Sequence, residues 1–203
     1  MTGAEEVLDF WFGELDETGM SGKDREKLWW SSGPDLDREI ERRFGALVTR
    51  ALAEDLEDWP DEPRFRLAKI ILLDQFTRNI FRGSARAFAG DPIALKLSKQ
   101  GLDRGEDKRL SPAQRAFFYM PLEHSESLED QDLSVAQFEA LHREFADIPG
   151  AKLLKGYCDY AERHRDIIRR FGRYPHRNRA LDRESTEAEL AYLAGGGATF
   201  GQG

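Results

Sequence analysis

Cysteine is nearly absent from this sequence, and its scarcity excludes two kinds of site. Cys158 is the single cysteine among 203 residues, so the chain has no internal disulfide and no cysteine-based metal cage. Long apolar runs are also missing, because no stretch approaches the roughly 20 apolar residues that a membrane-spanning helix needs. The acidic first residues lack the basic region of a secretory signal. We therefore expect a cytoplasmic protein without a membrane partner.

Positive charge is also in deficit, which bears on the partners of the protein. The formal net charge is −8, with 33% charged and 40% apolar residues. This composition is typical of a soluble globular protein and argues against general affinity for nucleic acid. The length suits one well-packed domain. We expect a single domain of residues 1–203, with residues 195–203 as a flexible tail, and the oligomeric state stays open.

The patterns that predict β-strands are lacking as well. No segment alternates Val, Ile and Thr with polar residues at the period of two that strands need. Helix start signals recur instead, for example at Asp91-Pro92 and Ser111-Pro112, where a capping residue precedes a proline. The sequence therefore predicts an all-α fold of about eight helices in antiparallel hairpins.

The stretch from Ile70 to Ala89 combines high apolar density with charge. A helical wheel of 100° per residue places Asp74 and Arg78 on the same apolar stripe as Leu67. This predicts a buried central helix in which Asp74 pairs with an arginine, most simply Arg78. Removing one partner of a buried ion pair costs about 3–5 kcal/mol. We therefore expect Asp74→Ala to destabilise the protein more than the double change that also replaces the arginine partner by Met.

Two other segments are unusually polar for their positions. His124 and Glu126 follow Pro121, which should place them at a disturbed helix end, and a loop rich in arginine and histidine begins at Arg173. His164, on the apolar face of a helix over 151–171, is expected to be a satisfied core residue. Polar groups at such places need partners, so we expect the polar segments to converge on one site. Its predicted ligand-binding residues are Asp74, Arg78, Arg82, Arg86, His124, Glu126, Arg173, His176 and Arg177.

Three stretches also carry a family resemblance. LLDQFTRNIFRGSARAFA, YMPLEHSES, and RFGRYPHRN followed by LDRESTEAE resemble the signature segments of the bacterial domain-of-unknown-function family 924. The resemblance implies an all-helical, tetratricopeptide-like fold, and it implies no reaction, cofactor or catalytic residue. Family members often have proline where this chain has Thr77, which implies a central helix that is kinked or ended there in relatives.

Two classes of function, and one structural alternative, fit these residues. The preferred hypothesis is binding of an anionic small molecule or an acidic peptide in an Arg/His-lined groove. The alternative is a hydrolase acting on a phosphate or carboxylate derivative, with Asp74, Glu126, His124 or His176 as acid and base. The third is a structural polar network without a ligand. Acid–base pairs inside a closed pocket would favour the enzyme, and an open groove would favour binding.

Metal-binding motifs are scarce. The single Glu-x-x-His spacing is Glu139 to His142, whereas di-iron bundles need two. His124 with Glu123 or Glu126, plus His164 and Asp74, could form a mixed oxygen and nitrogen site if the fold brought them together, but no recognised spacing supports it. The sequence therefore predicts no metal and no cofactor.

Overall fold

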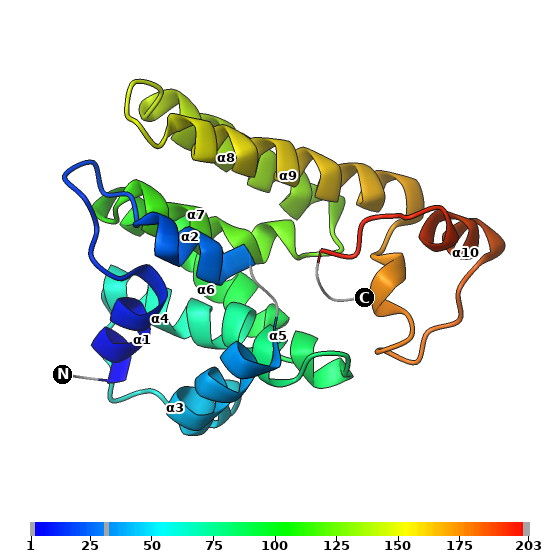
Figure 1. The fold of residues 1–203 in the computed structure, drawn as a ribbon, viewed down its shortest axis with the longest axis horizontal. Helices are drawn as coiled ribbons and strands as arrows, with labels where there is room; N and C mark the ends of the chain where they lie inside the picture. Colours follow the sequence, from blue (N-terminus) through cyan, green and yellow to red (C-terminus); the bar gives the residue numbers. More distant parts are fainter. Residues whose placement is uncertain (1–2, 31–32, 201–203) are drawn as a thin grey trace.

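The computed structural model describes residues 3–30 and 33–200 of the chain, and these residues form an all-α fold (Figure 1). The α-helices are α1 (Gly3–Phe12), α2 (Lys23–Trp30), α3 (Pro34–Leu52), α4 (Pro63–Ile70), α5 (Thr77–Ile80), α6 (Asp91–Asp103), α7 (Pro112–Glu123), α8 (Leu128–Glu144), α9 (Ala151–Phe171) and α10 (Glu187–Ala194). The π-helix η1 (Ile71–Phe76) joins α4 to α5 without a break, and η2 (Ala85–Phe88), η3 (Glu106–Arg109) and η4 (Pro175–Arg177) are short 3-10 turns. Counting that joined helix once, the described residues contain nine α-helices. The prediction of an all-α fold is confirmed.

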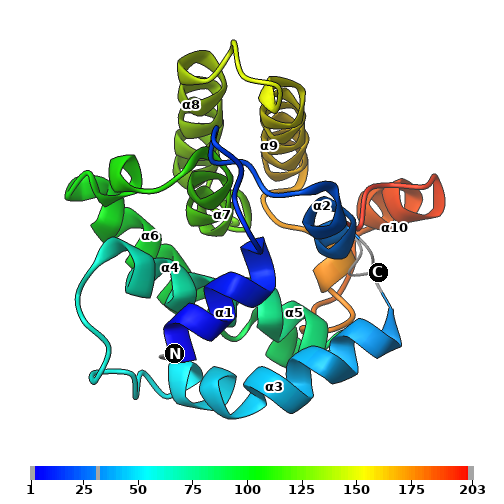
Figure 2. The ribbon, with the colours of Figure 1, turned by 60° about the vertical axis from the view of Figure 1, so that its left-hand side comes forward.

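The long helices α8 and α9 form an antiparallel hairpin, and α7 packs beside α8 (Figures 1 and 2). On the other side of α7, helices α1, α3 and the joined α4–η1–α5 helix form a second group, with α3 packed along η1 and α5. Antiparallel neighbours were predicted from the short connections, and the α8–α9 pair shows one. The finer expectation of a tetratricopeptide-like stack stays a prediction.

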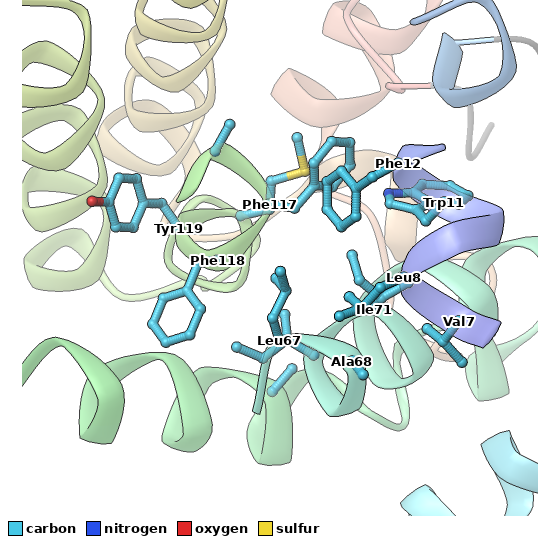
Figure 3. Close-up of a cluster of buried hydrophobic side chains, with 14 of the residues drawn as sticks. Val7, Leu8, Trp11, Phe12, Leu67, Ala68, Ile71, Phe117, Phe118 and Tyr119 are labelled. Atoms are coloured by element: carbon cyan, nitrogen blue, oxygen red, sulfur yellow. The ribbon is translucent and has the colours of Figure 1, made fainter. Parts of the chain in front are cut away.

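An aromatic core joins these two groups of helices. The ring centroids of Trp11 on α1 and Phe117 on α7 lie 5.6 Å apart, and Trp11 also meets Phe76 at 5.4 Å. Figure 3 shows the same core from α1 and α4 to α7, with Leu67 beneath the rings. Edge-to-face ring pairs of this kind are each worth about 0.5–1.5 kcal/mol beyond the apolar area that they bury. The core therefore fixes η1 and α7, the two elements that carry the polar groups described below.

The central helix is less regular than the sequence predicted. Its last α-helical residue is Ile80, and its middle turn is π-helical. The expectation of one regular helix was wrong here, because a π-turn adds a residue and shifts every later side chain around the axis. Thr77 follows this wide turn, and its hydroxyl donates to the carbonyl of Leu73 at 2.7 Å.

The last described residues, 198–200, contact α10 and α9. Residues 201–203 lie outside the described part, but the preceding residues, predicted to belong to a flexible tail, make defined contacts. The amide of Ala198 donates to the Tyr192 hydroxyl at 2.9 Å, and the Phe200 ring stacks on His164 with centroids 3.6 Å apart. Over the two described ranges, no helix is both long enough and apolar enough to cross a membrane.

Candidate functional site

A cavity of about 320 Å³ lies where α2, η1, α5, the end of α7, α9 and η4 meet. Its walls include side chains from all three polar segments that the sequence singled out, although these segments are separated by tens of residues. The predicted site residues that line it are Arg78, Arg82, His124, His176 and Arg177. The structure therefore brings these five residues, from all three segments, to one cavity.

Asp74 lies behind the cavity wall and holds His124 in place. Its carboxylate is fully buried, and Oδ1 is 2.6 Å from Nδ1 of His124 while Oδ2 accepts from the Gln75 amide at 2.6 Å. Arg78 contacts the same Oδ1 at 3.2 Å, so the predicted buried Asp74–Arg78 pair is confirmed. Burial alone would raise the pKa of Asp74, but the ring of His124 and the guanidinium of Arg78 hold it below its ordinary value.

The same surroundings favour the neutral form of His124. Burial lowers the pKa of its imidazole, and the neighbouring Arg78 cation lowers it further. Because an ionised Asp74 can only accept, Nδ1 of His124 carries the hydrogen and Nε2 keeps its lone pair. His124 is therefore available as a base or a ligand on the side away from Asp74.

Asp91 is the residue that the sequence analysis missed. Its carboxylate accepts two hydrogen bonds from Arg78, at 2.8 and 3.0 Å, and a third from Arg177 at 3.3 Å. The Asp91-Pro92 pair was interpreted as a helix cap, and α6 does start there, but Gly90 occupies the N-cap position and no side chain caps the helix. A Cβ on Gly90 would lie 2.2 Å from the Leu73 carbonyl oxygen. Glycine therefore lets α6 approach η1 closely enough for Asp91 to reach Arg78.

The remaining predicted residues are committed to other partners. Arg82 reaches the cavity but forms a paired contact with Asp37 at 2.9 and 3.0 Å. Three further residues do not line the cavity. Glu126 pairs with Arg183 at 2.7 and 3.0 Å, Arg173 pairs with Glu189 at 2.7 and 2.8 Å, and Arg86 lies exposed over the Phe81 ring at 3.8 Å. These contacts support the structural-network hypothesis for this outer part of the polar cluster.

Three polar atoms of the cavity residues have no hydrogen-bond partner in the described chain. They are Nε of Arg177, Nδ1 of His176 and the hydroxyl of Tyr157, and all three are buried. Burial lowers the pKa of Arg177, with a further contribution from the nearby Arg78 cation. Burial also lowers the pKa of His176 to about 3, and the neighbouring Arg177 cation contributes to this shift. The cavity residues therefore include one guanidinium N–H without an acceptor and two further polar atoms without a partner, and leaving such groups buried and unpaired is costly.

A second polar group in the cavity wall joins the end of α7 to α9. Nδ1 of His164 lies 3.0 Å from Oε1 of Glu123 and 2.9 Å from the Tyr160 carbonyl oxygen. One donor atom from each of Glu123, His124 and His164 lies within 4.8 Å of the other two. His164 was expected to be a satisfied core residue, and it is both buried and part of the cavity lining. This set of residues could hold a metal ion.

Aromatic side chains complete the cavity. Trp30 of α2 is 56% exposed, and its ring stacks on Tyr160 of α9 with centroids 6.3 Å apart. Phe200 lies beside Tyr160 and stacks on His164. Trp30 reaches the cavity wall through the contacts of its ring with the rings of Tyr157 and Tyr160 on α9.

The comparisons with known proteins agree with this fold. The model of the family described as "Bacterial protein of unknown function (DUF924)" matches residues 7–197. The chain belongs to this family. A solved structure of a protein of unknown function from Agrobacterium tumefaciens is 34% identical, covering 94% of this chain and 96% of that chain with a TM-score of 0.77. No curated protein matches. The resemblance seen in the three signature segments is confirmed.

Proposed function

We propose that the protein binds a small organic anion carrying a planar ring in the cavity described above. The observation that carries this proposal is the buried guanidinium of Arg177, whose Nε donates to no acceptor in the described chain. Leaving a buried donor unsatisfied costs about 1–3 kcal/mol, and more for a charged group. An anion that accepts from Arg177 removes this cost.

The distribution of carboxylates around the cavity supports an anionic ligand. Asp91 is shared between two guanidiniums, and Arg78 takes the shorter contacts, so Arg177 is left with a single longer one at 3.3 Å. The Arg177 cation also lies between two rings, 4.7 Å from the Phe88 centroid and 4.4 Å from that of Tyr174. These rings restrict the plane of the guanidinium, and a guanidinium with an unpaired N–H can form a bidentate contact with a carboxylate or phosphate.

The size and the aromatic lining support a small ligand with a ring. A volume of about 320 Å³ is at the lower end of the roughly 300–1,000 Å³ that is usual for small-molecule sites. That volume suits a compact molecule better than an acidic peptide. Trp30 and Tyr160 offer aromatic faces, and the Tyr157 hydroxyl offers a donor without a partner. The planar ring of a ligand can stack on Trp30 and Tyr160 while the anionic group of the same ligand reaches Arg177.

Isothermal titration with phenyl phosphate and with inorganic phosphate, both in the presence of a chelator, tests the proposal. Phenyl phosphate should bind more tightly than inorganic phosphate. Since a hydrogen bond to a charged group is worth about 1.5–3 kcal/mol, Arg177→Met should weaken binding by about 10- to 100-fold. Arg179→Met is the matched control, because Arg179 is an exposed arginine two positions away. Failure of wild type to bind either probe, or equal loss in both variants, would contradict the proposal.

The hydrolase alternative has one observation in its favour. The Asp74 carboxylate orients His124 at 2.6 Å within the cavity wall, which is the arrangement in which a neutral imidazole can act as a general base. Turnover of p-nitrophenyl phosphate or p-nitrophenyl acetate that is lost in His124→Asn would support this function. Tight binding of phenyl phosphate without any turnover would support binding alone.

A further inference from the structure

We propose that Glu123, His124 and His164 form a binding site for a divalent transition-metal ion, of which zinc is the best fit. The three residues come from the end of α7 and the middle of α9, and one donor atom of each lies within 4.8 Å of the other two. Two imidazoles and one carboxylate are a donor set that zinc and other first-row ions bind well. The inference does not depend on the proposed anion.

The tautomer of each histidine is set for metal binding. Asp74 lies 2.6 Å from Nδ1 of His124, and the Tyr160 carbonyl oxygen lies 2.9 Å from Nδ1 of His164. Both oxygens act as acceptors, so each Nδ1 carries the hydrogen and each Nε2 keeps a lone pair. Metal-binding histidines usually show this arrangement, with the second ring nitrogen donating to a carboxylate or a backbone carbonyl.

In the described chain, the Nε2 atoms of both histidines lack a hydrogen-bond partner. No hydrogen bond links Nε2 of His124 or of His164 to a protein group, although both side chains line the cavity. A structural interpretation, in which Glu123 pairs with His164 at 3.0 Å and Asp74 pairs with His124 at 2.6 Å, accounts for the contacts of both Nδ1 atoms. It gives no partner to either Nε2, although both histidines line the same cavity.

The surroundings tolerate an added cation. Glu123 and Asp74 contribute two carboxylates at the cluster. The guanidinium of Arg78, which lies in the same cavity wall, already donates two hydrogen bonds to Asp91. Three protein ligands leave at least one coordination position open toward the cavity, as in zinc sites that bind water or a substrate.

Titration of the chelator-treated full-length protein with Zn²⁺ alone, without phosphate, tests the site. We expect saturable binding of one zinc ion per chain. His164→Gln and His124→Gln should each weaken it, and Asp74→Asn should weaken it by about 10- to 100-fold, as expected for the partner that orients a ligand. His142→Gln is the matched control, since it removes the histidine of the Glu139–His142 pair on α8, which does not line the cavity. Its zinc affinity should equal that of wild type.

X-ray absorption at the zinc edge of the wild-type protein gives a readout that needs no variant to fold. We expect two imidazole nitrogens at about 2.0–2.1 Å from zinc, with oxygen completing the shell. Absence of saturable zinc binding by the wild type, a spectrum without two imidazoles, or equal loss in His142→Gln and His164→Gln would overturn the proposal. Because the anion titration is run with chelator and this one without phosphate, failure of one proposal is distinguishable from failure of the other.

Discussion

Nδ1 of His124 lies 2.6 Å from Oδ1 of Asp74, although the two residues are 50 positions apart in the chain. This contact joins the π-helical turn η1 to the last turn of α7, the two elements that the aromatic core holds together. The polar cluster therefore rests on a rigid base, which is what a preorganised binding site needs.

Asp91 should matter more to stability than its place at a helix start suggests. Asp91→Ala leaves two buried guanidiniums without their shared carboxylate, so the free energy of unfolding should fall by about 3–5 kcal/mol. Adding Arg177→Met should restore part of the loss. Urea denaturation measures this, with Asp103→Ala at the other, exposed end of α6 as the control, for which a change within about 0.5 kcal/mol is expected. A loss of less than about 1 kcal/mol in Asp91→Ala would count against the shared-carboxylate geometry.

The structure reverses the expected order of the Asp74 variants. Sequence reasoning predicted that Asp74→Ala would cost more than the double change with Arg78→Met, on the premise that Arg78 would be left unpaired. Arg78 keeps two hydrogen bonds to Asp91 in the single variant. In the double variant Asp91 loses both of those hydrogen bonds. The double variant should therefore unfold at a lower urea concentration than Asp74→Ala. Equal or higher stability of the double variant would show that Asp91 does not hold Arg78 in solution.

Acid should weaken the attachment of α10 through Glu189. Its hydrogen bonds from Arg173 lower its pKa from the ordinary value of 4.5 to about 2. A carboxyl whose pKa is depressed in the folded state contributes stability above its unfolded pKa and loses that contribution as the pH falls toward the folded value. The melting temperature of Glu189→Gln should therefore fall below that of wild type at pH 6 and approach it between about pH 4.5 and pH 2. Glu187→Gln, which replaces an exposed glutamate in the first turn of α10, is the control and should melt at the wild-type temperature at pH 6.

Two glycine substitutions should act in opposite directions. Gly90→Ala places a methyl group 2.2 Å from the Leu73 carbonyl oxygen, so α6 must move away from η1. We expect a loss of about 1–3 kcal/mol, the range for overpacking, together with weaker anion binding as Asp91 shifts. Gly156→Ala on α9 meets nothing within 4 Å, so it should stabilise the protein by about 0.5–1 kcal/mol. Thermal melts of both variants are the measurement, and a neutral Gly90→Ala would argue against this close approach.

The residues that start helices were the most informative part of the sequence. Ser111 caps α7 as predicted, and Ser111 and Thr186 each form a capping box with Gln114 and Glu189, because capping is a local interaction between residues three apart. Periodicity failed at Ile71–Phe76, where the helix widens. No spacing of apolar residues in that stretch distinguishes a π-turn from an α-turn.

The site was predictable only in part, because some of its contacts depend on how helices pack against each other. Asp74, Arg78 and His124 could be found because charges on an apolar stripe or at a proline-disturbed helix end need partners. Asp91 and Phe200 could not, since their roles depend on which helices approach each other. Glu126 was assigned to the site because it follows Pro121, and Arg173 because it begins a polar loop, but each pairs with a residue of opposite charge in the last segment of the chain.

A crystal structure of the protein with phenyl phosphate tests the central claim most directly. We expect one ligand in the cavity, with phosphate oxygens within about 3 Å of the Arg177 guanidinium, the usual length of a charge-assisted hydrogen bond. The phenyl ring should stack on the aromatic group formed by Trp30 and Tyr160. Phosphate bound only at exposed arginines such as Arg179, with the cavity filled by water and Nε of Arg177 still without an anion, would contradict it.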